Sequence, residues 1–116
     1  MSIIGTRPEI IRLAEVLKKC DEYFEHVLVH TGQNWDYTLN DVFFEELELR
    51  KPNHFLGVVG NNLGETMGNI IAESYKILAQ ERPDALLILG DTNSCLSAIA
   101  AKRLKIPVFH MEAGNR

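Results

Sequence analysis

The sequence predicts an α/β fold, with a Rossmann-like parallel sheet flanked by helices. Short apolar runs alternate along the chain with longer segments whose apolar residues recur at helical spacing. The run Ala85–Leu89 is apolar throughout, as expected of a central parallel strand that is covered on both faces. Strands alternating with helices indicate βαβ units and a parallel sheet.

The first half of the chain contains three predicted strands, at Met1–Ile4, Val27–His30 and Phe55–Val59. Pro8 suits the first turn of the helix that follows the first strand, because its missing N–H has no intrahelical partner there. One face of that helix is marked by apolar residues, namely Ile10, Leu13, Ala14 and Leu17. Helical spacing also appears within Asp36–Leu47, at Leu39, Val42, Phe43 and Leu47.

The second half predicts two helices and two strands. A long helix ending before Pro83 is expected to bury Leu63, Met67, Ile70, Ile71, Ile77 and Leu78. The strand Ala85–Leu89 follows, then a helix whose apolar positions are Leu96, Ile99, Ala100 and Leu104, and a fifth strand at Pro107–Met111. Right-handed crossovers favour the strand order 3-2-1-4-5, which places the first strand beside the fourth.

Size and charge exclude several classes of protein. The 116 residues suffice for one domain, and the net charge of −4 without a basic run argues against a nucleic-acid partner. The apolar runs are too short to span a membrane, and no targeting peptide is visible, so we expect a cytoplasmic protein. Cys20 and Cys95 lie in apolar helical patterns and are interpreted as structural thiols. The chain ends at Arg116 inside a polar turn, which favours an incomplete domain of a longer protein.

Four polar clusters follow predicted strands, and parallel strands bring such clusters to one edge of the sheet, where ligands of α/β folds bind. In the first cluster, Arg7 stands at the start of a helix, where exposed N–H groups already favour an anion such as phosphate or carboxylate. Arg12 lies about one turn further along and could reinforce that site. The alternative for Arg7 is a surface arginine paired with Glu9 or Glu15.

Two carboxylates, Asp91 and Glu112, follow the fourth and fifth strands and are candidate acid and base groups. Asp91 could instead be an N-cap of the next helix. Glu112 could instead be held in a salt bridge to an arginine such as Arg116, which is itself a candidate for lining the same cleft. Gln33 lies in a loop that could hydrogen-bond a sugar or nucleotide.

His30 and His110 each end a strand, and each is interpreted as a hydrogen-bonded wall residue more readily than as a base. No G-x-G-x-x-G follows the first strand, which argues against a dinucleotide cofactor. Walker A, H-E-x-x-H and C-x-x-C motifs are also absent from the sequence. The residues alone therefore indicate an α/β domain that binds a polar, phosphorylated ligand.

Three linked motifs follow the predicted strands in order along the chain, namely Gly5-Thr6-Arg7-Pro8-Glu9, Gly90-Asp91-Thr92 and Glu112-Ala113-Gly114. These motifs resemble the signature turns of the non-hydrolysing UDP-N-acetylglucosamine 2-epimerases, and the resemblance runs along the whole chain. Longer stretches resemble the branch that forms UDP-N-acetyl-L-fucosamine from UDP-2-acetamido-2,6-dideoxy-L-talose for capsule and O-antigen (lipopolysaccharide) synthesis. These stretches are Arg7–Leu13, His30–Asn34, Leu89–Cys95 and His110–Arg116.

This resemblance implies a two-domain fold of the glycosyltransferase-B type, of which residues 1–116 would be most of the N-terminal Rossmann-like domain. The C-terminal UDP-binding domain would be missing, the fragment alone inactive, and the complete protein a homodimer. The implied reaction removes the C2 proton and expels UDP, then adds both back with C2 inverted. By position, Asp91 and Glu112 would be the catalytic acid and base. The substrate would be bound by Arg7, Arg12, Gln33 and Arg116.

No redox cofactor is implied, because the hydrogen leaves as a proton. One departure concerns Arg12, since the glucosamine-type enzymes carry a lysine there. Arginine keeps the charge but not the proton affinity of lysine, so diphosphate binding is favoured over proton transfer. Two alternatives stay open: a UDP-sugar-binding module without catalysis, and a glycosyltransferase of the same fold.

Overall fold

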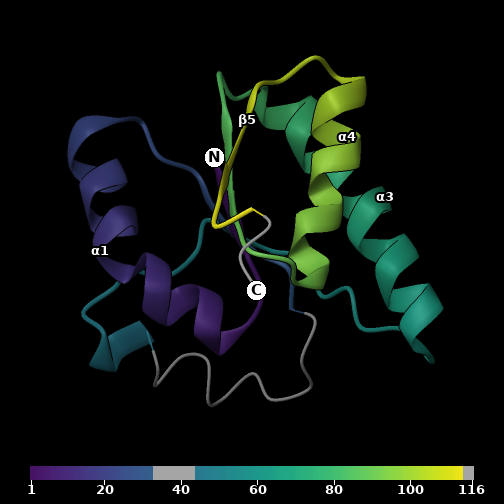
Figure 1. The fold of residues 1–116 in the computed structure, drawn as a ribbon, viewed down its shortest axis with the longest axis horizontal. Coiled ribbons are helices and arrows are strands. Elements are labelled where there is room, and N and C mark those ends of the chain that lie inside the picture. Colours follow the sequence, from purple (N-terminus) through teal and green to yellow (C-terminus); the bar gives the residue numbers. More distant parts are fainter. Residues whose placement is uncertain (33–43, 114–116) are drawn as a thin grey trace.

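The computed structural model describes residues 1–32 and 44–113, and in these ranges five strands form one parallel sheet (Figure 1). The strands are β1 Ser2–Ile4, β2 Leu28–His30, β3 His54–Phe55, β4 Leu86–Leu89 and β5 Val108–Met111. The helices are α1 Arg7–Tyr23, α3 Leu63–Glu81 and α4 Ser97–Arg103, with the 3₁₀ turn η1 at Asn93–Leu96. The strand order β3-β2-β1-β4-β5 confirms the predicted topology and the α/β, Rossmann-like fold class.

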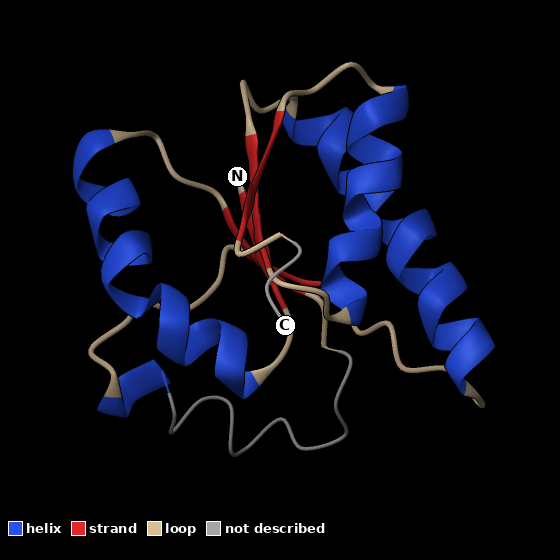
Figure 2. Cartoon of the chain, viewed as in Figure 1, coloured by secondary structure: helices blue, strands red, loops and turns tan. Residues whose placement is uncertain are grey.

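Helices cover both faces of the sheet, with α1 on one side and α3 and α4 on the other (Figures 1 and 2). Successive residues of a strand point to opposite faces, so each strand contributes to both layers. In β1, Ile3 packs in the cluster that contains Leu78 of α3, whereas Ile4 packs with Ile10 and Leu13 of α1. All of these side chains are fully buried, which fixes the register of the central strand.

Helix α1 confirms the predicted apolar face, because Ile10, Leu13, Ala14 and Leu17 are all buried. Thr6 is its N-cap, and Pro8 occupies the first turn as expected. The strand–turn–helix unit that carries the first polar cluster is thus formed as the sequence indicated.

The third strand is shorter than predicted, since β3 contains only two residues and the proposed range Phe55–Val59 is wrong in its extent. Gly57 adopts φ +62°, a left-handed conformation that ends the extended run. The chain still follows β2 for a short distance, because the Leu56 N–H donates to the His30 carbonyl and the Val58 N–H to the Thr31 carbonyl.

Two helix faces also differ from the prediction. In α3, Leu63 is 64% exposed, and the buried line runs at i, i+4 spacing through Thr66, Ile70, Ser74 and Leu78. In α4, Ile99 is 49% exposed, because the small residues Ala100 and Ala101 face the core instead. The helix predicted within Asp36–Leu47 lies mostly outside the described residues; of its range, residues 44–46 are helical.

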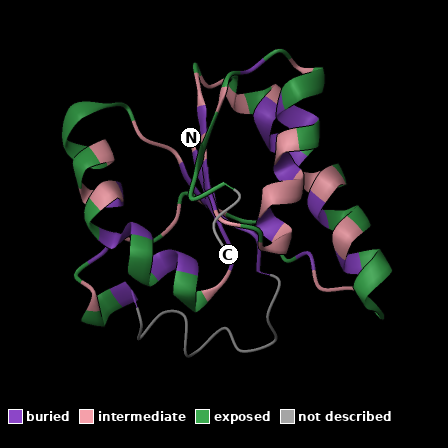
Figure 3. Cartoon of the chain, in the orientation of Figure 1, coloured by how far each residue is buried: buried purple, intermediate pink, exposed green. Residues whose placement is uncertain are grey.

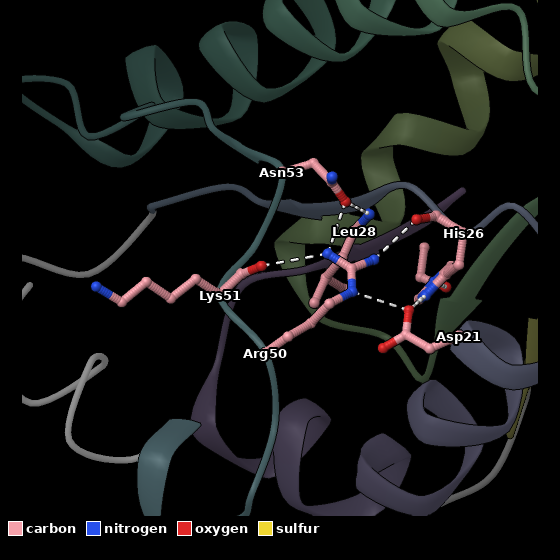
Figure 4. A network of polar contacts seen from close by, with 7 residues as sticks. Asp21, His26, Leu28, Arg50, Lys51 and Asn53 are labelled. Carbon is pink, nitrogen blue, oxygen red and sulfur yellow. Dashed lines mark hydrogen bonds and ion pairs between the residues drawn. The ribbon is translucent and has the colours of Figure 1, made fainter.

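The amino ends of β2 and β3 are joined by a polar network centred on Arg50 (Figure 4). Its guanidinium donates to Asp21 Oδ1 at 2.9 Å, to the His26 carbonyl at 2.8 Å and to Asn53 Oδ1 at 2.8 Å. Asn53 Oδ1 also accepts from the Leu28 N–H at 2.8 Å. The network ties the end of α1 to the start of both strands, at the edge of the sheet opposite the polar clusters.

The edge strand β5 is covered less than the strands inside the sheet, as Figure 3 shows. Phe109, His110 and Met111 are all exposed, and Phe109 is 61% exposed. Among the helices in the described ranges, none is long and apolar enough to cross a membrane.

Candidate active site

Three polar turns lie at the carboxyl edge of the sheet, after β1, β4 and β5. Because β4 pairs with both β1 and β5 in parallel, the turn at Gly90–Asp91 lies between the turns that begin at Gly5 and at Glu112. Gly90 has φ +71°, so the chain leaves β4 through a conformation that favours glycine. The topology thus places the predicted acidic and basic residues on one edge.

An ion pair connects α1 with the end of β5. Arg12 Nη1 donates to Glu112 Oε2 at 3.0 Å, and the two side chains are 61% and 36% exposed. The alternative interpretation of Glu112 as a salt-bridge partner of an arginine is supported by this contact with Arg12. Arg116 and Gln33 lie outside the described residues.

The backbone of Glu112 is unusual, since its φ of +55° is left-handed and not provided by glycine. Such a conformation costs about 1 kcal/mol for a residue with a Cβ. It turns the chain directly after Met111, and the Arg12 contact fixes where the carboxylate points.

Arg7 is the first residue of α1, and its side chain is exposed at the helix N-terminus. Of the two carboxylates considered as its partners, Glu15 lies 3.3 Å from Lys18 and Glu9 is buried with other donors. Arg7 lies at the N-terminus of α1, where the helix dipole favours an anion.

Asp91 is exposed, and it does not cap the helix that follows. The N-cap of η1 is Thr92, and no side chain donates or accepts a capping hydrogen bond there. In the part of the chain that the structure describes, the Asp91 carboxylate makes no hydrogen bond and no ion pair. The N-cap interpretation of Asp91 is therefore not supported by the structure.

Glu9 does not have the surface position that the alternative interpretation of Arg7 requires. It is not a surface partner of Arg7 but is only 2% exposed, and its carboxylate accepts hydrogen bonds from Gly5, Thr6 and Ser94. The spacing Thr6-x-x-Glu9 is that of a capping box, and this motif could have revealed the inward position from sequence.

The two strand-ending histidines are both hydrogen-bonded to the backbone, in agreement with their interpretation as wall residues. His30 is buried, its Nδ1 accepts from the Gly32 N–H at 2.9 Å, and its ring stacks on Phe55 with centroids 5.1 Å apart. His110 Nε2 donates to the carbonyl of Gly90, which ties the β5 end to the β4 turn.

Cys95 is also a backbone donor, with its Sγ 3.1 Å from the carbonyl oxygens of Leu89 and Gly90. Burial, together with the charge of Glu9, raises the pKa of its thiol above the usual range. A protonated thiol suits a structural role and not that of a nucleophile. Within residues 1–32 and 44–113, no group of three or more His, Cys, Asp or Glu side chains could hold a metal ion.

Comparison with known proteins identifies the family. Residues 18–116 match the family model described as UDP-N-acetylglucosamine 2-epimerase. The chain is 39% identical over 117 residues to a UDP-N-acetylglucosamine 2-epimerase homolog of Methanococcus maripaludis, covering 100% of the chain and 33% of that protein. It therefore spans about a third of the length of the curated relatives that it matches.

Solved structures agree in fold. A UDP-N-acetylglucosamine 2-epimerase from Rickettsia bellii is 56% identical with a TM-score of 0.90, over 100% of this chain and 31% of that one. The Methanocaldococcus jannaschii enzyme in complex with UDP-GlcNAc and UDP is 39% identical with a TM-score of 0.89, over 99% of this chain and 32% of that one. The chain with this arrangement of turns belongs to the UDP-N-acetylglucosamine 2-epimerase family.

Proposed function

We propose that residues 1–116 are most of the N-terminal domain of a non-hydrolysing UDP-N-acetylhexosamine 2-epimerase, an isomerase of the glycosyltransferase-B fold. The observation that carries the proposal is the 3.0 Å contact between Arg12 and Glu112, which brings a cation and a carboxylate together beside the Asp91 turn. The bound UDP-GlcNAc and UDP in the Methanocaldococcus jannaschii relative support a UDP-sugar as the ligand.

The proposed reaction inverts C2 in two steps. A base removes the C2 proton as the bond from C1 to the UDP oxygen breaks, which gives a 2-acetamidoglycal and UDP. UDP then adds back to C1 while an acid delivers a proton to the opposite face of C2. Asp91 and Glu112 are proposed as the acid and base, because proton transfer on both faces needs two groups.

Arginines are suited to the departing diphosphate, whose charge develops as the bond breaks. We assign Arg7, at the N-terminus of α1, and Arg12, in the next turn, to this role. Gln33 and Arg116 are proposed as further substrate contacts on the strength of their motifs. No redox cofactor is required, since no electron pair leaves the sugar as hydride.

The finer identity of the sugar follows the sequence motifs, which favour UDP-N-acetyl-L-fucosamine as product, with UDP-N-acetylmannosamine as the alternative. Relatives differ in this respect, since one from Pseudomonas aeruginosa, 38% identical, is a UDP-2,3-diacetamido-2,3-dideoxy-D-glucuronate 2-epimerase. A role in surface polysaccharide synthesis, a cytoplasmic location and a homodimeric complete protein belong to the same proposal.

The test is the exchange of hydrogen at C2. The complete protein is incubated in D₂O with UDP-GlcNAc and, separately, with UDP-2-acetamido-2,6-dideoxy-L-talose, and deuterium at C2 is followed by NMR. Incorporation into one substrate together with its C2 epimer supports the proposal and identifies the sugar. If neither UDP-sugar takes up deuterium at C2, the proposal is contradicted. Release of UDP that depends on an added acceptor would indicate a glycosyltransferase.

Asp91→Asn separates catalysis from binding. If the protein is an epimerase, this variant loses turnover while its affinity for the UDP-sugar, measured by calorimetry, stays within about threefold, because the amide keeps the size of the side chain. If the wild-type protein binds the UDP-sugar without turnover, the domain is a binding module.

A further inference from the structure

We propose that Glu9 is a positioning residue, which holds the turn that carries Arg7 in register with the turn that carries Asp91. The expected effect of Glu9 on turnover rests on the proposed function. The hydrogen bonds by which Glu9 couples the two turns are a property of the fold and do not depend on that function. The proposal adds to the substrate-contacting residues a buried carboxylate, that of Glu9, which does not itself contact the substrate.

The first half of the coupling lies within the β1–α1 turn. Glu9 Oε2 accepts from the Gly5 N–H at 3.0 Å, from the Thr6 N–H at 2.7 Å and from Thr6 Oγ1 at 2.9 Å. A capping box needs only one of these backbone bonds. The additional donors fix the backbone on the N-terminal side of Arg7, while Glu9 itself fixes the C-terminal side.

The second half crosses to the β4–η1 turn. Glu9 Oε1 accepts from Ser94 Oγ, a residue 85 positions away, and Ser94 is fully buried. A serine hydroxyl has one hydrogen, and here it goes to Glu9. In the 2.8 Å contact between Thr92 Oγ1 and Ser94 Oγ, Thr92 is therefore the donor.

The resulting chain of donors runs from Thr92 through Ser94 to Glu9. Thr92 directly follows Asp91, so the chain fixes the backbone beside the proposed acid or base. A buried carboxylate is stable only when it is fully hydrogen-bonded, and here the donors come from both turns. Displacing one turn from the other would leave Glu9 Oε1 without its Ser94 donor, although the three donors to Oε2 would remain, so this single contact holds the two turns in register.

Ser94→Ala in the complete protein tests the coupling, because it removes the contact between the turns and leaves every proposed substrate-contacting residue in place. We expect kcat to fall about 10- to 100-fold with KM changed less than about threefold, as for reacting groups displaced by a fraction of an ångström to about 1 Å. Ser74→Ala is the matched control, since Ser74 is equally buried and its Oγ has no hydrogen-bond partner in the described ranges. It should leave kcat unchanged.

A double-mutant cycle tests whether Ser94 affects kcat through Glu9. If Ser94 acts through Glu9, adding Ser94→Ala to Glu9→Gln lowers kcat by less than about twofold, whereas independent effects would multiply. Should Ser94→Ala fail to fold, Thr92→Val removes the preceding donor while keeping the shape of the side chain. Its kcat should fall about 3- to 10-fold if the chain of donors positions Asp91.

Amide hydrogen exchange over residues 2–9 provides a readout that needs no turnover. The Gly5 and Thr6 N–H groups, both bonded to Glu9, should exchange faster in Ser94→Ala than in the wild type or Ser74→Ala. If the wild type does not epimerise at all, the proposed function fails, and the coupling is judged on this exchange alone. Unchanged exchange, or full kcat in an active Ser94→Ala enzyme, would overturn the inference.

Discussion

The guanidinium of Arg12 lies 3.0 Å from the Glu112 carboxylate, although 100 positions separate the two residues in sequence. The contact joins α1, which follows the first strand, to the end of β5, the last strand of the sheet. Both side chains are partly exposed, so the pair contributes only about 0–1 kcal/mol to the free energy of unfolding. We therefore expect the Arg12–Glu112 pair to affect catalysis and not the stability of the fold.

Replacing Arg12 by Gln should separate these two effects. We expect kcat/KM for epimerisation to fall about 10- to 100-fold, because the variant loses the cation that contacts Glu112 and that we propose binds the diphosphate. The free energy of unfolding, measured with urea, should change by less than about 1 kcal/mol. Lys18→Gln removes a comparable exposed pair with Glu15 on the same helix and should leave both quantities unchanged.

Arg12→Lys refines the same prediction. If charge is what the site needs, lysine should retain kcat/KM within about tenfold of the wild type. A loss as large as that of Arg12→Gln would instead show that the planar donor geometry of arginine is required.

The left-handed backbone at Glu112 leads to a second prediction: a glycine at this position should be more stable than an alanine, although turnover should be lost with either residue. Glu112→Gly should raise the free energy of unfolding relative to Glu112→Ala by about 1 kcal/mol, because glycine adopts φ +55° without strain. Both variants should lose turnover. Arg82→Gly is the control: Arg82 has φ +48° at the C-cap of α3, far along the chain from the site.

The control should be stabilised without losing activity. Equal stability of Glu112→Gly and Glu112→Ala would show that the residue is not strained, and an active Glu112→Gly enzyme would remove Glu112 from the mechanism.

Periodicity and strand–helix alternation were sufficient to predict the sheet order and the buried face of α1. The strand order follows from crossover handedness, which is a general property of such folds. The end of β3 was not predictable from apolar residues, because it depends on the conformation of Gly57. Similarly, the outward position of Ile99 depends on close packing at Ala100 and Ala101.

The site residues likewise include some whose positions the sequence predicts and others whose contacts depend on the folded structure. That Asp91 and Glu112 share an edge follows from topology, whereas the partner of Glu112 depends on how α1 lies relative to β5. Glu9 was interpretable from its capping-box spacing, but its bond to Ser94 joins two turns that only the folded sheet brings together.

Arg50 is expected to be important for stability alone, because the partners in its network (Figure 4) lie at the starts of β2 and β3, at the end of the strands opposite the polar turns. Arg50→Ala should lower the free energy of unfolding by about 1–2 kcal/mol, since several charge-assisted hydrogen bonds to exposed or partly buried groups are lost together. Arg50→Lys should recover less than half of this, because one ammonium cannot reach acceptors that a planar guanidinium spans. Lys76→Ala, at an exposed helical pair with Glu73, is the control and should cost less than about 0.5 kcal/mol.

The same network predicts how stability depends on pH. Burial lowers the pKa of His26 below its usual value, against the opposing effect of Asp21, whose Oδ1 lies 2.7 Å from His26 Nδ1. The unfolded chain then binds the proton more readily than the folded one, so stability is fully present above about pH 6.5. It decreases as the pH falls from there towards the lower pKa of the folded state.

The ionisation of Asp21 makes stability decrease further at more acidic pH. Burial disfavours its charge, but hydrogen bonds from His26 and Arg50 outweigh that effect and lower the pKa of its carboxyl group. Its contribution to stability is present above about pH 4 and decreases as the pH falls through the folded-state value. Urea denaturation between pH 3 and pH 8 measures both regions. His26→Gln should flatten the part of the curve that falls just below about pH 6.5, and an unchanged slope there would show that another group is responsible.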